Sequence, residues 1–119
     1  MNDRLQRFVD WVTVLVERNA PEAELLPAAR AAMRALVAHD DWLPESATRP
    51  HPQYYQQYLL YRDPAARFSV VSFVWGPGQK TPVHDHTVWG VIGVFCPGPQ
   101  TKLTTEKRAA GSRYSRYCW

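Results

Sequence analysis

At 119 residues the chain has the size of one small domain, and its 45% hydrophobic residues permit a core, which excludes a wholly disordered protein. No apolar run is long enough to span a bilayer, and the first residues lack the pattern of a secretory signal, so the cytoplasm is the expected compartment. The net charge of +3 arises entirely behind residue 95, because residues 1–95 hold nine Lys/Arg against ten Asp/Glu. A nucleic-acid partner is therefore not expected.

The N-terminal part of the sequence predicts two helices. Apolar residues follow a helical spacing over residues 3–18, and Asn2 or Asp3 can cap the first turn. A second helix is expected from Pro27, which suits a first turn, to His39. The proline-rich segment 40–52 predicts a loop.

From Gln53 onward the apolar pattern changes to a period of two, which indicates strands. Aromatic residues are frequent over 53–63, and the segment 67–75, RFSVVSFVW, is apolar at nearly every position, so both of its faces are expected to be covered. A turn is predicted at 76–79, a short strand at 81–86 and another strand at 89–95. The order of two helices followed by consecutive strands predicts an α+β, mainly β fold with an antiparallel sheet or barrel.

The pattern changes again behind Phe95. Residues 96–119 contain both cysteines, Cys96 and Cys118, five basic residues and very few aliphatic ones. This composition predicts a basic, poorly ordered tail with two free thiols. The abrupt change suggests an altered reading frame. One functional hypothesis is that this tail binds RNA or acidic partners. Its basic residues show no amphipathic or aromatic arrangement, which weakens this hypothesis.

Two histidines one residue apart, His84 and His86, are the main chemical signal. On a strand they project from the same face, while Asp85 projects from the other. Two neutral imidazoles side by side suit a first-row transition metal, although such a pair is also common on a solvated strand face. A catalytic site normally takes three protein ligands, and no histidine follows His86. His39 and His51 are expected to be ordinary surface residues.

The segment RFSVVSFVWGPGQKTPVHDHTVWGVIGV, residues 67–94, resembles the metal-binding segment of bacterial thiol dioxygenases. These enzymes form the cysteine dioxygenase type I family of the cupin superfamily and include 3-mercaptopropionate dioxygenases. The resemblance extends over residues 1–95. It implies N-terminal helices packed outside a double-stranded β-helix, of which this chain would hold the first half.

The resemblance implies an iron(II)-dependent oxidation of a small thiol, cysteine or 3-mercaptopropionate, to its sulfinate by O₂. His84 and His86 match the first two of three histidine ligands in the family. The alternative function is a non-catalytic cupin-like module that binds a metal or a small ligand. The oligomeric state is left open.

Gln57 is the candidate substrate-binding residue. It matches the position at which the cysteine-specific branch has an arginine for the substrate carboxylate, and a glutamine there resembles the branch that prefers 3-mercaptopropionate. Gln57 could equally be a barrel-facing amide without a role. Val91 stands where the animal enzymes have the cysteine of a cysteine–tyrosine crosslink, so no crosslink is expected.

The resemblance ends at residue 95. Family members continue with further strands that carry the third histidine and a supporting Ser-His-Tyr group, whereas residues 96–119 resemble none of these. The expected consequences are a low iron affinity, an inactive site when the third ligand is missing, and an open edge that promotes aggregation.

Overall fold

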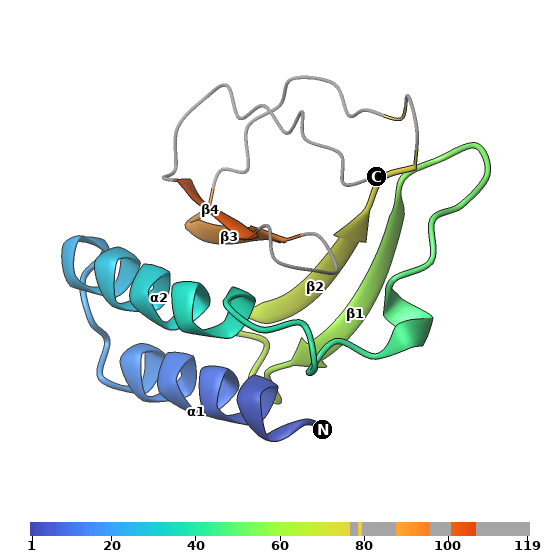
Figure 1. Cartoon of the computed structure of the whole chain (residues 1–119). Helices are drawn as coiled ribbons and strands as arrows, with labels where there is room; N and C mark the ends of the chain where they lie inside the picture. Colours follow the sequence, from blue (N-terminus) through green and yellow to red (C-terminus); the bar gives the residue numbers. More distant parts are fainter. Residues whose placement is uncertain (77–78, 80–87, 96–100, 107–119) are drawn as a thin grey trace.

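The computed structural model describes residues 1–76, 79 and 88–95, together with the backbone of strand 101–106. Helix α1 (Asp3–Glu17) and helix α2 (Glu22–Val37) precede a short 3₁₀ helix, η1 (Glu45–Ala47). The strands are β1 (Gln56–Arg62), β2 (Ser69–Val74), β3 (Gly90–Phe95) and β4 (Thr101–Glu106). Figure 1 shows the two helices side by side, with β3 and β4 lying over α2 and the β1–β2 hairpin beside them.

Helix α1 agrees closely with the sequence prediction. Asn2 caps it, because its side-chain oxygen accepts a hydrogen bond from the backbone N–H of Arg4 at 2.8 Å. The predicted apolar positions form its buried face. The helix ends at Glu17, and Asn19, two residues further on, adopts a positive φ of 51°, a conformation that asparagine tolerates better than most residues.

Helix α2 begins five residues earlier than predicted, at Glu22, and Pro27 lies inside it. Proline at this position cannot donate the helical hydrogen bond to the carbonyl of Ala23. The first turn nevertheless forms, because Leu25 is buried and its N–H donates to the carbonyl of Pro21 at 2.8 Å. Burial of an apolar side chain thus outweighs the local signal of the proline.

Strands β1 and β2 form an antiparallel hairpin whose register pairs Gln57 with Phe73 and Tyr58 with Ser72. A bulge at Leu60 shifts the register, so that Tyr61 pairs with Val70. One face of the hairpin packs on the rest of the protein, where Val70 is buried, whereas Phe73 on the other face is 41% exposed. The expectation that both faces of the 67–75 strand are covered is therefore wrong.

The hydrophobic core lies between the two helices and the covered face of the hairpin. Its buried members come from α1, α2, the following loop and β2: Leu5, Phe8, Val9, Val12, Leu36, Trp42 and Val70. The indole N–H of Trp42 donates to the carbonyl of His39 at 2.8 Å, so the polar end of this buried ring is satisfied. The core therefore joins the helices to the hairpin as one packed unit.

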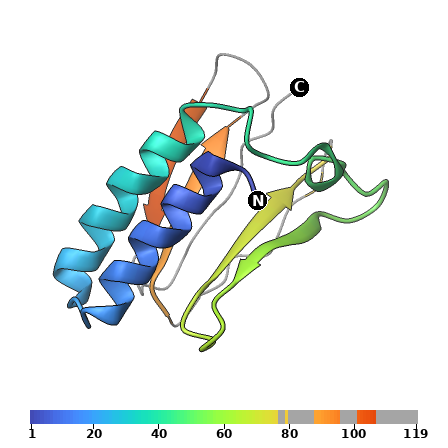
Figure 2. The same cartoon turned by 90° about the horizontal axis from the view of Figure 1, so that it is seen from below.

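Strands β3 and β4 form a second antiparallel pair, separate from the β1–β2 sheet. Figure 2 shows this pair running alongside the helices. Gly93 of β3 meets Met33 and Val37 of α2 so closely that an added Cβ would lie 2.4 Å from the Val37 Cγ1 atom. Residues 101–106, which the sequence assigned to an irregular tail, form β4; residues 96–100 and 107–119, with both cysteines, lie outside the described part.

The described structure has helices followed by antiparallel strands, which confirms the α+β class. None of its helices combines the length and the apolar composition needed to cross a membrane.

Candidate functional site

Three residues were singled out by sequence, and the structure describes one of them. His84 and His86 lie in the segment 80–87, outside the described residues, as does the strand expected at 81–86. Within the described residues, no three His, Cys, Asp or Glu side chains gather as a metal site. Gln57 lies in β1 and is exposed.

Gln57 belongs to the open face of the hairpin. Residues i and i+2 of a strand share a face, which places Tyr55, Gln57 and Leu59 beside Phe73 and Trp75 of the partner strand. The Gln57 amide Nε2 donates to the Tyr55 hydroxyl at 3.4 Å, a long hydrogen bond that constrains the amide weakly. The side-chain amide can therefore turn toward a ligand on this face.

Three aromatic rings form the rest of this open face. Tyr55 and Phe73 both stack against Trp75, with ring centroids 5.8 and 5.7 Å apart, and Tyr55 lies 6.3 Å from Phe73. Leu59, further along the same face, is 64% exposed. The face thus combines one polar amide with a preorganised apolar wall, the composition typical of small-ligand sites.

The turn that follows β2 is held by Gln79, a residue that the sequence did not single out. Its N–H donates to the carbonyl of Gly76 at 3.1 Å, and its side-chain oxygen accepts from the Gly76 N–H at 2.6 Å. Its amide nitrogen donates to the carbonyl of His51 at 2.6 Å. Gln79 therefore ties the start of the segment that carries His84 and His86 to the loop before β1.

His51 is a structural residue rather than an ordinary surface histidine. Its Nδ1 atom accepts hydrogen bonds from the N–H groups of Gln53 and Tyr54, at 3.0 and 3.2 Å, and its ring stacks on Tyr54 with centroids 5.0 Å apart. Because Nδ1 accepts, the neutral ring carries its proton on Nε2. In this geometry the Nδ1 lone pair of His51 is therefore occupied by the backbone of the loop.

The loop between β1 and β2 contains an ion pair with a buried carboxylate, between Asp63 and Arg67. Asp63 is only 1% exposed and its carboxylate accepts from Arg67 three times: from the backbone N–H at 3.0 Å, from Nε at 2.8 Å and from Nη2 at 2.9 Å. The side-chain hydrogen bonds from Arg67 outweigh burial and lower the pKa of Asp63 from 3.8 to about 2.

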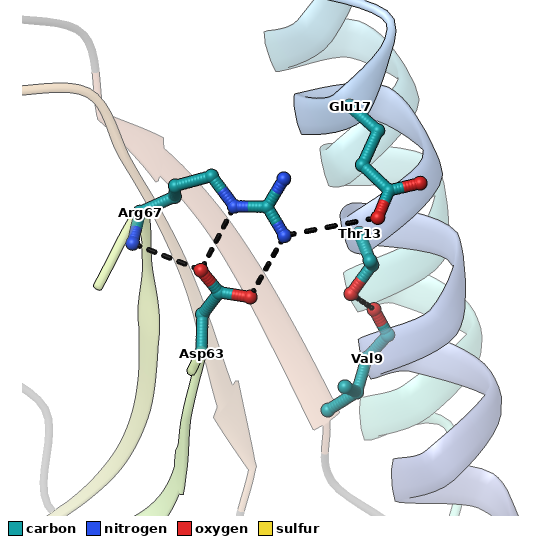
Figure 3. A network of polar contacts seen from close by, with 5 residues as sticks. All are labelled: Val9, Thr13, Glu17, Asp63 and Arg67. Carbon is teal, nitrogen blue, oxygen red and sulfur yellow. Dashed lines mark hydrogen bonds and ion pairs between the residues drawn. The ribbon is translucent and has the colours of Figure 1, made fainter. Parts of the chain in front are cut away.

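This pair also connects the hairpin to α1. The Arg67 guanidinium lies 3.8 Å from a carboxylate oxygen of Glu17, and Figure 3 shows it bridging Asp63 and the helix. Ala66, inside the loop, has a positive φ of 56°, and its N–H donates to the carbonyl of Asp63 at 2.8 Å. We call the Asp63–Arg67 pair, with its contact to Glu17, the clamp. The spacing of Asp63 and Arg67 within RDPAAR is a signal from which it could have been predicted.

No protein-family model matches the chain.

Proposed function

We propose that the chain is a cupin-type thiol dioxygenase, which oxidises a small thiol to its sulfinate with O₂ and uses iron(II) bound by His84 and His86. The observation that carries this proposal is the HDH triplet at 84–86, which follows the β1–β2 hairpin, whose open face presents Gln57 and three aromatic rings. Support also comes from the hydrogen bonds of Gln79, which anchor the segment leading to the two histidines.

The donor set fits a borderline metal, because imidazole is a good ligand for iron, zinc, copper and nickel. When bound, iron(II) supplies the redox centre for the transfer of both atoms of O₂ to the thiol sulfur. The chain's own residues orient the substrate. The amide N–H of Gln57 donates to the substrate carboxylate, and the aromatic rings of the same face keep water away from its carbon chain.

The first experiment is anaerobic loading with iron(II), followed by oxygen uptake with cysteine and with 3-mercaptopropionate. We expect one O₂ consumed per sulfinate formed, and we expect the H84A/H86A double variant to lose at least about 100-fold in iron affinity. Absence of oxygen uptake with both thiols, in protein shown to contain iron, would refute the dioxygenase proposal.

Gln57 gives a second test, on substrate binding. We expect Q57A to raise the KM for 3-mercaptopropionate about ten- to hundredfold with little change in kcat, because a hydrogen bond to a charged group stabilises bound substrate by roughly 1.5–3 kcal/mol. Q56A is the matched control, since Gln56 neighbours Gln57 but lies on the other face of β1. Equal KM values for Q57A and Q56A would show that Gln57 does not bind the substrate.

A non-catalytic metal-binding module is the second candidate. It is favoured by the count of histidines: besides His84 and His86 the chain has only His39, just behind α2, and His51, whose Nδ1 atom accepts two backbone hydrogen bonds. Two ligands are fewer than a redox-active mononuclear site normally takes. Stoichiometric zinc after purification, with no iron-dependent oxygen uptake, would favour this module over the enzyme.

A further inference from the structure

A groove between α1 and α2, away from the hairpin, has a composition that suits a ligand. Its volume is about 380 Å³, within the range of small-molecule sites. Helix α1 lines one side of the groove with the rings of Phe8 and Trp11 and the side chains of Arg4 and Arg7. Its opposite wall is Leu36 and four alanines of α2 at helical spacing, among them Ala31 and Ala35.

The charged side chains described in this groove are positive. Among the residues that the structure describes, Arg4 and Arg7 are the charged ones that line it. Arg4 is neutralised by Asp41, whose carboxylate lies 2.9 Å from its Nε atom. Arg7, within the part of the chain that the structure describes, makes neither an ion pair nor a hydrogen bond. One uncompensated guanidinium therefore stands at the edge of an apolar groove, where a single anionic group would complement it.

The apolar part of the groove is open to solvent. Trp11 is 49% exposed although it is the largest side chain of α1, and Ala31 and Ala35 are also exposed. A stable protein interface takes about 20–30 residues on each side, whereas nine of the described residues line this groove. The size therefore favours a small molecule over a partner helix.

We propose that the α1–α2 groove binds a small amphiphilic carboxylate, whose apolar chain lies on the alanine wall against Trp11 and whose carboxylate pairs with Arg7. This site is separate from the open face of the hairpin and does not depend on iron. The Arg7–carboxylate pair contributes specificity, and the apolar chain contributes most of the affinity.

The test is calorimetric titration of the full chain with dodecanoate, below the concentration at which it forms micelles, and with dodecanol and dodecyltrimethylammonium as neutral and cationic controls. We expect saturable binding of dodecanoate with a stoichiometry of one, binding of dodecanol about three- to tenfold weaker, and still weaker binding of the cationic amphiphile, because the chain supplies most of the affinity and the Arg7 charge supplies the discrimination. R7Q should weaken it about three- to tenfold, whereas R30Q, on α2 but outside the groove, should leave it unchanged.

A31W tests the location of the site, because an indole on this exposed position fills the groove without entering the core. We expect at least a tenfold loss of dodecanoate affinity, with an unchanged far-ultraviolet circular dichroism spectrum and melting temperature. Unchanged affinity in folded A31W overturns the proposal, as does equal binding of the three amphiphiles or no saturable binding. If A31W unfolds, the comparison of R7Q with R30Q decides the question alone.

Discussion

Replacing Gly93 by alanine is expected to destabilise the protein by about 1–3 kcal/mol, because the new methyl group has no space between β3 and α2. The Cβ atom would lie 2.4 Å from Val37 Cγ1 and within 2.9 Å of two Met33 atoms. The Met33 side chain is flexible and can move aside. Val37 is β-branched and buried, so the strand or the helix must shift instead.

Urea denaturation of G93A beside G90A measures this effect. Gly90 belongs to the same strand, but an alanine Cβ there meets no atom within 4 Å, so we expect G90A to be neutral or slightly stabilising. In the V37A background, G93A should cost less than in the parent, because the clashing methyl is gone. A loss in G90A as large as in G93A would show that the close approach of Gly93 to α2 is not what destabilises G93A.

Removing the charge of Asp63 is expected to lower the melting temperature by several degrees in D63N. The carboxylate accepts three hydrogen bonds from Arg67, and an amide in its place would turn an N–H₂ group toward one or more of these donors. The loop would also lose its connection to Glu17 of α1, because Asp63 orients the Arg67 guanidinium. D10N, which removes an exposed carboxylate bonded only to Gln6, is the matched control and should leave the melting temperature nearly unchanged.

The same pair predicts a pH dependence. Because the pKa of Asp63 is lowered from 3.8 to about 2 in the folded state, its stabilising contribution is complete above about pH 4. It is lost progressively as the pH falls through about 2, where the folded protein takes up the proton. The difference in unfolding free energy between the parent and D63N should therefore shrink between pH 4 and pH 2. A difference that stays constant over this interval would contradict the proposed clamp.

Helix α1 and the strand segments could be predicted from the sequence because they depend on local signals. The apolar period of α1, its Asn2 cap and the change to a period of two near Gln53 are properties of neighbouring residues. The structure of the hairpin turn was harder to predict from the sequence, although Asp63, Ala66 and Arg67 stand close together in it. Its stability depends on the geometry that they adopt rather than on their identity alone.

Of the candidate site, sequence located Gln57 on a strand and the structure places it on the exposed face, but Gln79 and His51 were missed. Their roles depend on contacts between the 51–54 loop and the turn after β2, 28 residues apart, which no periodicity records. Sequence also gave His51 no structural role, whereas two backbone N–H groups engage its ring.

The sequence by itself determined the α+β class and the position of α1 to within one residue, and it contains the HDH triplet on which the metal-site proposal rests. Only the tertiary structure decided that α2 passes through Pro27, that one face of the hairpin stays open and that Gly93 cannot carry a side chain. The physical reason is the same in each case: burial and close packing between distant segments outweigh the local conformational preferences of single residues. These preferences amount to less than about 1 kcal/mol for most residues and to about 3 kcal/mol for proline.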